Sequence, residues 1–534
     1  MRIARRLMLP VGIAAAAAFA CGRDTFGHKG TPPVPPGLVF AAISSAVPTI
    51  AAGTVSVPVQ AVFFNGGTTS AIVPPVSLFF EDSAGNPIAD FVARTDPQGV
   101  AAVVGSGATL SVPFAVEVPV SLALGSVHVR GTASTLVSQT DLTWGVSGMT
   151  EILVDTTADS IAADGRTSLR EAILAANAAV TDARISFSPA VFPAAAPATI
   201  TLVLTTGAAG TEVLPEIHGE AHRVIVDGTH RGVRVKPGAA LKNDARFGFH
   251  ITGQVELAGL TFAGMGDLYP TFDVSTDDCA GNEQTGGAVI ADGVGTVVAH
   301  NVFDGTGVAE RNCYAREVQW AGGGGHRILD NVFIALPGDA GEAYAPVAEI
   351  SRNLVLPSTD DGFIINILPP TPMLIAENVV IGQQCSGLYL SPSNQGTAQV
   401  WNNTLVGSGL TCGGGAGMRL DGGFFADVRN NALQHNAVGI ELSGGVTAAL
   451  THSSSYAEPF LVDNDTGNDS VIRDASVSTA ANILLTGTNG NSFASFAPQA
   501  ASPLVDSGEN LVDMNGDATG TFNGAASDRG AVER

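Results

Sequence analysis

One six-residue pattern recurs six times between residues 298 and 433 and constrains the fold more than any other feature of the sequence. It consists of an apolar residue, two variable residues, Asn, one variable residue and a second apolar residue. Short β-branched or aromatic runs, broken by Gly, Asp and Pro, separate the repeats and favour strands and turns over helices. We therefore predict that each interval forms one coil of strands. The asparagines are Asn301, Asn331, Asn353, Asn378, Asn403 and Asn431, at steps of 30, 22, 25, 25 and 28 residues.

The position of Asn in the pattern predicts that its side chain points into the coil. Side chains two residues apart in a strand share a face, and the residue two positions after each Asn is apolar. A single buried amide is costly, but amides stacked about 4.8 Å apart in successive coils can bond to one another and to the turn backbone. The alternative, that Asn is merely common in turns, leaves the apolar residues on both sides unexplained.

A ladder of this kind resembles the internal asparagine ladder of right-handed parallel β-helix proteins. The resemblance implies an all-β fold in which residues 149–500 form a pectate-lyase-like solenoid. Leu257, Leu260 and Phe262 repeat the pattern with Leu in place of Asn, so we expect the ladder to begin one coil after the solenoid does. Residues 263–287 and 304–325 are too long for turns, and we expect them to be loops on one side of the solenoid.

Residues 150–177 predict how the first coil is covered. Ser168 and Glu171 have the spacing of a helix capping box, and a helix over residues 168–177 would carry one apolar face. The Ser-Leu-Arg-Glu-Ala sequence that starts at Ser168 closely resembles the CSLREA-type motif of secreted β-helix proteins. That resemblance implies a short cap helix over the open end, where apolar surface and unpaired strand edges would otherwise be exposed.

The N-terminus predicts export and a lipid anchor. Three arginines and an apolar run make residues 1–20 a signal peptide, too short to span a membrane. The last residues of this run resemble a lipobox, which implies a bacterial lipoprotein with lipidated Cys21, located at the outer membrane or cell surface. A plain cleavable signal is the alternative. With the lipid anchor, the proline-rich residues 21–37 would form a tether between the membrane and the folded part.

Residues 38–148 predict one β-sandwich. Alternating strands at residues 55–64 and 110–118 are separated by turn signals such as Asn65-Gly66-Gly67. Their spacing and this turn resemble immunoglobulin-like adhesion modules of bacterial surface proteins, which implies a spacer or docking role. A formal charge of −24 argues against binding to nucleic acid. We expect a monomer.

Four cysteines besides Cys21 predict disulfides, because the number is even and the protein is expected to be exported. Cys385 lies seven residues after Asn378 and Cys412 nine after Asn403, which places both near the same point on successive coils. Cys279 and Cys313 would then pair across the long loops. Three connectivities are possible, and this is the one that we expect.

Residues 501–534 resemble the terminal segment of secreted β-helix proteins, which implies a cap on the last coil. Asp513, Asn515 and Asp517 have the alternate-oxygen spacing of a calcium loop but lack its following Gly and later Glu. We therefore predict a solvated turn, with Ca²⁺ binding as the alternative and no other cofactor.

The candidate catalytic residues are Asp360, Asp361 and His326. The Asp pair, in residues 358–365, resembles the Asp-containing strand start of polygalacturonases, where one carboxylic acid protonates the leaving oxygen and another activates water. His326 would have to serve as the family's downstream His, yet it precedes the pair. A lyase would instead require the two acids to hold calcium and a base such as Arg352.

Two considerations oppose an enzyme. Adjacent residues in a strand point to opposite faces, so we expect at most one of Asp360 and Asp361 to face a given site. The Asp-Asp-Gly sequence is also typical of a turn between coils, and His326 would then be an ordinary loop histidine.

We therefore predict an adhesin-like binding or structural lipoprotein whose partner is a carbohydrate or another surface component. The alternative is a polysaccharide hydrolase or lyase on the same scaffold. The two differ in whether Asp360 or Asp361 lines a groove with a second carboxylate and His326 nearby. We expect Gln383 in an exposed turn, which would make it a neutral site for substitution.

Overall fold

Strands dominate the computed structural model, and the one α-helix among the described residues is α1 (Leu169–Asn177). The structure describes residues 37–45, 56–73, 76–81, 92–95, 103–117, 125–133, 136–144, 149–203, 213–229, 231–241, 247–268, 286–308, 315–411, 415–451, 453–456, 461–463 and 470–473.

Two antiparallel sheets form the first folded unit. One has the order β1-β2-β7-β5 and comprises Leu38–Ser45, Ser56–Asn65, Thr109–Glu117 and Val92–Thr95. The other has the order β4-β8-β9 and comprises Val76–Glu81, Gly125–Ala133 and Leu136–Trp144. A short pair joins β3 (Ala71–Ile72) to β6 (Val103–Val104).

Buried side chains from both sheets share one apolar cluster, including Phe40 and Phe63 from the first sheet and Phe80 and Val129 from the second. The Asn65 turn is present, and its amide donates hydrogen bonds to the carbonyl oxygens of two neighbouring segments. The two predicted strands of this region are thus confirmed within one or two residues.

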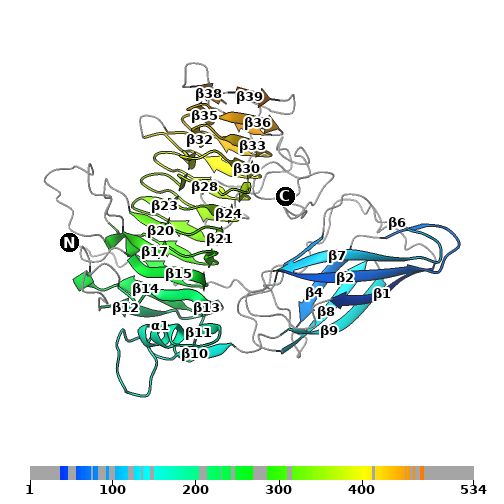
Figure 1. Ribbon diagram of the computed structural model, residues 1–534, viewed down its shortest axis with the longest axis horizontal. Coiled ribbons are helices and arrows are strands. Elements are labelled where there is room, and N and C mark those ends of the chain that lie inside the picture. Colours follow the sequence, from blue (N-terminus) through cyan, green and yellow to red (C-terminus); the bar gives the residue numbers. More distant parts are fainter. Residues whose placement is uncertain are drawn as a thin grey trace, which may run out of the picture.

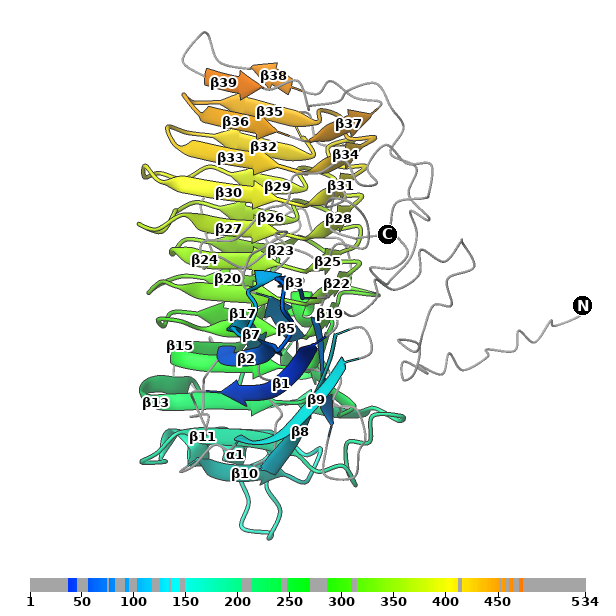
Figure 2. The ribbon, with the colours of Figure 1, turned by 90° about the vertical axis from the view of Figure 1, so that its right-hand side faces the viewer.

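The rest of the described chain forms a stack of parallel coils (Figure 1). It begins with β10 (Thr150–Val154), β11 (Ala183–Phe187), β13 (Ile217–Asp227) and β15 (Phe247–Ala258). From β17 to β37 each coil contributes a first, a second and a third strand, and β38 and β39 are the first and second strands of the last described coil. Each strand pairs with its counterparts in the neighbouring coils. The first and second strands belong to a 20-stranded sheet, and the third strands form a 10-stranded sheet (Figure 2).

The strands of each column are short. The first strands are β17 (Gly287–Ala291), β20 (Arg316–Trp320), β23 (Asp339–Ala343), β26 (Phe363–Ile365), β29 (Leu388–Leu390), β32 (Met418–Asp421), β35 (Ile440–Ser443) and β38 (Leu461–Asp463). The second strands are β18 (Val297–Ala299), β21 (His326–Leu329), β24 (Val347–Ser351), β27 (Met373–Ala376), β30 (Thr397–Trp401), β33 (Phe425–Arg429), β36 (Thr447–Thr451) and β39 (Ser470–Arg473).

The third strands begin earlier in the chain. They are β12 (Ala198–Leu202), β14 (Val233–Pro237), β16 (Thr261–Ala263), β19 (Val302–Asp304), β22 (Val332–Ile334), β25 (Leu354–Val355), β28 (Val379–Ile381), β31 (Thr404–Val406), β34 (Ala432–Gln434) and β37 (Ser454–Tyr456). Two 3-10 turns, η1 (Ala239–Leu241) and η2 (Met265–Asp267), lie between them. This mostly-β arrangement with long parallel sheets is compatible with the predicted β-helix.

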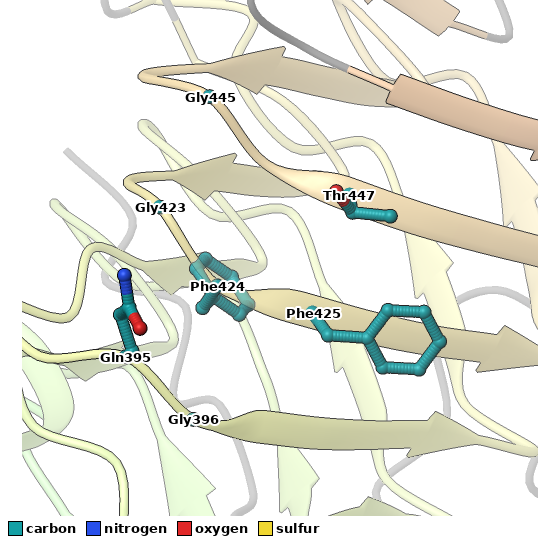
Figure 3. A pocket seen from close by; sticks show the side chains of 7 residues that line it. All are labelled: Gln395, Gly396, Gly423, Phe424, Phe425, Gly445 and Thr447. Atoms are coloured by element: carbon teal, nitrogen blue, oxygen red, sulfur yellow. The ribbon is translucent and has the colours of Figure 1, made fainter.

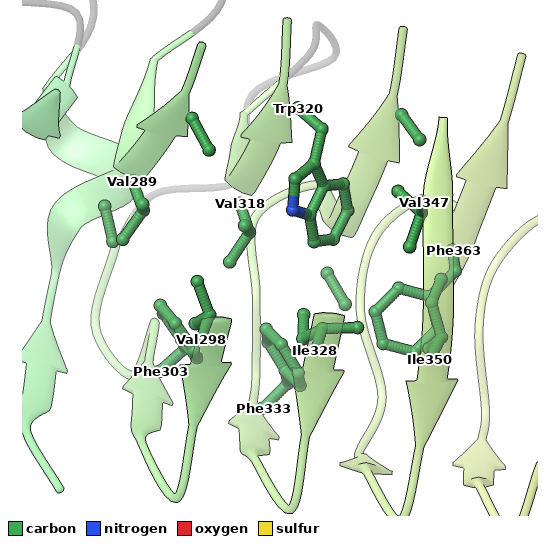
Figure 4. Close-up of a cluster of buried hydrophobic side chains, with 14 of the residues drawn as sticks. Val289, Val298, Phe303, Val318, Trp320, Ile328, Phe333, Val347, Ile350 and Phe363 are labelled. Carbon is green, nitrogen blue, oxygen red and sulfur yellow. The ribbon is translucent and has the colours of Figure 1, made fainter. Parts of the chain in front are cut away.

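In-register pairing stacks like side chains inside the coils. The rings of Phe262, Phe303 and Phe333 stack with centroids 4.9 and 4.7 Å apart, and Phe363 meets Phe333 edge-on. All four are buried in one continuous core. Figure 4 shows Phe303, Phe333 and Phe363 among the buried side chains. Burial of such rings contributes apolar area and a further favourable contact between rings.

The asparagine ladder is confirmed. All six side chains are fully buried, and each Nδ2 from Asn301 to Asn403 donates to the Oδ1 of the next asparagine at 3.0–3.2 Å. At the start, the Leu260 backbone N–H donates to Asn301 Oδ1, and at the end the Asn431 N–H donates to Ser453 Oγ. Because β12, β14 and β16 all precede β19, the ladder starts further into the solenoid than the one coil that we expected.

A left-handed residue precedes every asparagine of the ladder. These residues have φ between 54° and 57°, a conformation that lets the chain turn sharply from the second strand to the third. They are His300, Asp330, Arg352, Glu377, Asn402 and Asn430.

The cap helix is confirmed, with its capping box. Ser168 Oγ accepts the Glu171 backbone N–H at 3.2 Å, and Glu171 Oε2 accepts the Ser168 N–H at 2.8 Å. The apolar face packs into the core, as expected. Arg170, within the same motif, is also buried and makes two hydrogen bonds to Asp159, a role that the sequence pattern did not predict.

Two further expectations are wrong. Gln383 does not lie in an exposed turn: it is 1% exposed, and its Nε2 donates to the carbonyl oxygens of Leu356 and Ile381. Residues 304–325 are not one loop, because β20 occupies part of them with a register set by β17.

Several expectations concern segments outside the described residues. They are the signal peptide and Cys21, the tether up to residue 36, Cys279, Cys313 and Cys412, the coils beyond residue 473, and the C-terminal segment with Asp513, Asn515 and Asp517.

Candidate functional site

Asp360 and Asp361 lie in the bend between β25 and β26, where the turn interpretation placed them. Because the bend is not a strand, their side chains do not point to opposite faces as expected. Their carboxylate oxygens lie within 4.8 Å of each other and of the Cys385 Sγ. Asp361 is 8% exposed, and Asp360 is half-buried.

Asp361 belongs to a column of buried hydrogen bonds that joins successive coils, which we call the acid column (Asp339, Asp361 and Ser386). Asp339 Oδ1 accepts the backbone N–H of Asp361 at 3.0 Å, and Asp361 Oδ1 accepts the backbone N–H of Ser386. Ser386 Oγ accepts the N–H of Ala416 at 3.4 Å. The two carboxylates therefore hold the starts of the first strands in place.

Burial makes this region electrostatically unusual. Burial and the neighbouring charge of Asp360 raise the pKa of Asp361 to about 7, although the hydrogen bond from Ser386 opposes the rise. Burial, with the nearby carboxylates, raises the pKa of Asp339 well above its usual range. Arg316 supplies positive charge, with its Nε 3.7 Å from Asp339 Oδ2 and an ion pair to Glu342. Asp361 can therefore exchange a proton near neutral pH.

His326 is not part of this cluster. It starts β21, at the turn between a first and a second strand, and is fully buried. Its Nε2–H donates to the carbonyl oxygen of Gly322 at 2.8 Å, and burial lowers the pKa of its imidazole. The charged neighbour that acts on it is Asp292 rather than Asp360 or Asp361. The structure therefore brings the two acids together, and among the described residues no histidine joins them.

The residues required for a lyase are not assembled either. Arg352 sits in the ladder turn between the second and third strands, where it makes two hydrogen bonds of 2.9 Å to Asp330. Cys385 is disulfide-bonded, so its sulfur is not a thiolate ligand for a metal beside the Asp pair. Its predicted partner, Cys412, lies outside the described residues.

The outer face of the first strands carries aromatic and charged side chains in register. Pairing aligns Glu342, Ile364, Tyr389, Arg419 and Glu441 on five successive coils. Their neighbours along each strand, such as Phe363 and Leu388, are fully buried, so the row lies on the outer side of the strands. Ile364, Tyr389 and Arg419 are half-buried there, whereas Glu342 and Glu441 are only 4% and 5% exposed.

Polar contacts and ring contacts fix the side chains of this face. The Arg419 guanidinium lies over the Tyr389 ring at 4.9 Å, and Arg316 lies over Tyr344 at 5.3 Å. Asn366 Nδ2 donates to Glu342 Oε1 at 2.7 Å. We call Glu342, Tyr344, Asn366, Tyr389, Arg419 and Glu441 the first-strand face. It combines aromatic rings with hydrogen-bonding groups.

An open depression of about 370 Å³ lies away from this face, beside the starts of β33 and β36 (Figure 3). Three of its seven lining residues are glycine; of its two phenylalanines, Phe425 is exposed and Phe424 is buried. It contains none of the candidate catalytic residues. The lining residues are Gln395, Gly396, Gly423, Phe424, Phe425, Gly445 and Thr447.

Sequence reasoning missed the acid column and a further column of buried polar groups, although both keep a constant distance from the ladder. Asp339, Asp361 and Ser386 follow a ladder asparagine by eight residues. Ser358, Gln383, Ser408 and Asn436 follow one by five. Counting from each Asn, rather than searching for one repeated residue type, would have found both.

Comparisons with protein-family models and with curated protein sequences find no match for the chain. Within the part of the chain that the structure describes, no helix is both long and apolar enough to cross a membrane.

Proposed function

We propose that this protein is a lipid-anchored surface protein that binds carbohydrate through the first-strand face. In this proposal the solenoid is a right-handed, pectate-lyase-like β-helix of the secreted CSLREA type, preceded by an immunoglobulin-like module. Cys21 carries the lipid at the outer membrane or cell surface, and the protein acts as a monomer without nucleic acid.

The observation that carries the proposal is the outward row of Tyr389, Arg419 and their neighbours. The coils stack at about 4.8 Å, so side chains of one row form a regular, rigid surface along the solenoid axis. Rings fixed by cation–π contacts offer faces to the C–H groups of sugars at little entropic cost, and the half-buried Asn366 amide and Arg419 guanidinium offer hydrogen bonds. Such a surface suits an extended polymer better than a compact ligand.

The test is binding of the full-length protein to a panel of soluble polysaccharides, with Tyr344→Ala/Tyr389→Ala as the variant. We expect the affinity to fall at least about fivefold, since ring contacts contribute about 0.5–1.5 kcal/mol each and the variant removes two of them. Phe425→Ala is the matched control, because Phe425 is 38% exposed and Tyr344 39%. Equal loss in both variants, or unchanged binding by the double variant, contradicts the proposal.

A polysaccharide hydrolase remains the second candidate because Asp361 has a pKa near 7 and a second carboxyl group beside it. These are two requirements of acid-assisted glycoside cleavage. The same panel tests it through the release of reducing ends, which Asp361→Asn should abolish. Binding without release of reducing ends favours the binding protein, which we prefer because Asp361 is buried and bonded to the Ser386 backbone.

The anchor is tested separately. Cys21→Ser should release the protein from membranes in a detergent-partition assay. Unchanged membrane association of this variant would count against lipidation at Cys21.

A further inference from the structure

A second group of metal-ligating side chains lies at the start of β13, far along the chain from the first-strand face. Glu216, His218 and Glu220 alternate in sequence, and Ile217 and Gly219 between them are buried. Because side chains two residues apart in an extended segment share a face, all three project outwards together. We propose that these three residues bind a divalent transition-metal ion, for which Zn²⁺ is the best match.

The distances suit such an ion. His218 Nδ1 lies 3.9 Å from Glu216 Oε1 and 3.7 Å from Glu220 Oε2, and the three ligand atoms lie within 4.8 Å of one another. Around a tetrahedral Zn²⁺ with bonds of about 2.0–2.1 Å, ligand atoms are separated by about 3.3 Å. The two distances from His218 Nδ1 must therefore contract by about half an ångström and the distance between the two carboxylates by up to about 1.5 Å, which rotation of the two exposed glutamate side chains can supply.

The ligand types select the metal. An imidazole nitrogen between two carboxylates fits Zn²⁺ and similar transition metals, whereas Ca²⁺ and Mg²⁺ prefer oxygen ligands throughout. With a neutral imidazole, the two carboxylates balance the charge of one divalent ion. The nearby Arg223 does not compete for them, because it is ion-paired with Glu256.

The backbone of this segment is held on both sides. Asn177, the last residue of α1, accepts the His218 backbone N–H at 3.0 Å and donates its Nδ2–H to the Glu216 carbonyl oxygen at 2.7 Å. The Thr252 hydroxyl, on β15, donates to the Ile217 carbonyl oxygen at 3.3 Å and so fixes the other side of the segment. It also lies 3.3 Å from His218 Nδ1, a contact that is given up when Nδ1 binds the ion. A rigid strand that fixes the directions of alternate side chains is the support that metal sites need.

The site is also accessible. The side chains of Glu216, His218 and Glu220 are 35%, 49% and 56% exposed, so an ion can enter without unfolding of the coil. Three protein ligands leave the fourth position of a tetrahedral ion to water or to a group from another molecule. Because Asn177 ties the same segment to α1, metal binding stabilises the junction between the cap helix and the first coils.

Calorimetric titration of the chelator-treated full-length protein with Zn²⁺ tests the proposal. We expect one saturable site, weakened at least about tenfold by His218→Ala and by Glu220→Gln, which keeps the shape of the side chain. His250→Ala is the matched control. His250 lies on β15, the strand next to β13, and its ring contacts the acid Asp292 at 2.8 Å, so Zn²⁺ binding by this variant should equal that of the wild type.

A second readout is the thermal unfolding midpoint, which Zn²⁺ should raise in the wild type and the His250→Ala control but not in Glu220→Gln. The proposal is overturned by absence of saturable Zn²⁺ binding to the wild type, or by equal affinity in the wild type and both site variants. Ca²⁺ that displaces Zn²⁺ at equal concentration would overturn the choice of metal.

Discussion

The asparagine ladder and the acid column both join successive coils by buried hydrogen bonds, at two different turns of the coil. The ladder uses amides, and the acid column uses carboxylates. In the ladder, each amide oxygen accepts the N–H of the preceding asparagine while its own nitrogen donates onward, as at Asn353 and Asn378. In the acid column, the oxygens of Asp339 and Asp361 accept a backbone N–H from the following coil, but an ionised carboxylate has nothing to donate.

That difference decides how the two corners respond to pH and to substitution. An amide carries donor and acceptor and no charge, so the ladder is satisfied at any pH. A buried carboxylate gains its hydrogen bond at the cost of desolvation, which is why the pKa of Asp339 and Asp361 is raised. An asparagine can therefore occupy the same position in many successive coils. In the acid column only two successive coils carry an acid, and the third carries Ser386.

Replacement of Asn378 by Leu should have the largest effect. It removes the acceptor for two donors of Asn353 and the donor to the Ile350 carbonyl oxygen, all buried. At about 1–3 kcal/mol for each abandoned group, the free energy of unfolding should fall by more than about 3 kcal/mol. Denaturant midpoints measure this.

The control for Asn378→Leu is Gln395→Ala, since Gln395 is an exposed amide and its loss should change stability by less than about 0.5 kcal/mol. If the two variants are equally stable, the ladder bonds contribute nothing and the comparison between the two corners fails.

The pH dependence of Asp361 comes next. Its pKa is raised when folded, so the folded protein binds more protons than the unfolded chain between about pH 4 and 7, and stability falls as the pH rises through this range. The loss is on the order of 2–4 kcal/mol. Asp361→Asn keeps an acceptor for Ser386 without the charge, so the variant should be more stable than the wild type at pH 8 and less pH-dependent.

Unfolding midpoints from pH 4 to 8 check this prediction, with the exposed Asp164→Asn as control. A wild type whose stability rises over this range, or a variant with the same slope, would show that the buried carboxylate is not destabilised by its charge.

Gln383→Leu should have an intermediate effect, because Gln383 is buried in the column five residues after each ladder asparagine. The variant leaves the Leu356 and Ile381 carbonyl oxygens without this donor, and we expect a cost of about 1–2 kcal/mol in the denaturant midpoint. A loss of unfolding free energy below about 0.5 kcal/mol is the value typical of an exposed residue and would contradict the importance of the buried Gln383 amide.

Ser386→Ala should have the smallest effect. The bond that its hydroxyl accepts from Ala416 is long, at 3.4 Å. The Asp361 carboxylate interacts with both the backbone N–H and the hydroxyl of Ser386, and the backbone N–H has the larger effect. We expect a loss of less than about 1 kcal/mol in the same assay. A larger loss would mean that the acid column depends on the serine hydroxyl as strongly as the ladder depends on its amides.

Features of this fold in which one residue type recurs could be predicted from the sequence. Features in which different polar residues occupy equivalent positions of successive coils could not. Asn301 to Asn431 recur with apolar neighbours at fixed offsets, so the direction and bonding of their side chains follow from strand periodicity. The capping box of Ser168 and Glu171 was predictable because its chemistry is local.

The candidate site was harder. Treating Asp360 and Asp361 as strand residues separated two carboxylates that the bend brings together, and sequence order alone left the position of His326 undetermined. Gln383 and the acids of the acid column use different residue types at equivalent positions. Their burial depends on coil register, which becomes visible only after the ladder has been aligned.

The bonding of the ladder has a consequence for how such a chain can change length. Every step from Asn331 to Asn403 is made by the same atoms, so a link does not depend on which coil supplies it. If the 25 residues from 354 to 378 were deleted or duplicated, the next coil would again place an asparagine next to Asn353 in the ladder, in the same orientation. The molecule can therefore be shortened or extended in whole steps of about 4.8 Å, a modularity that a domain with a closed core does not possess.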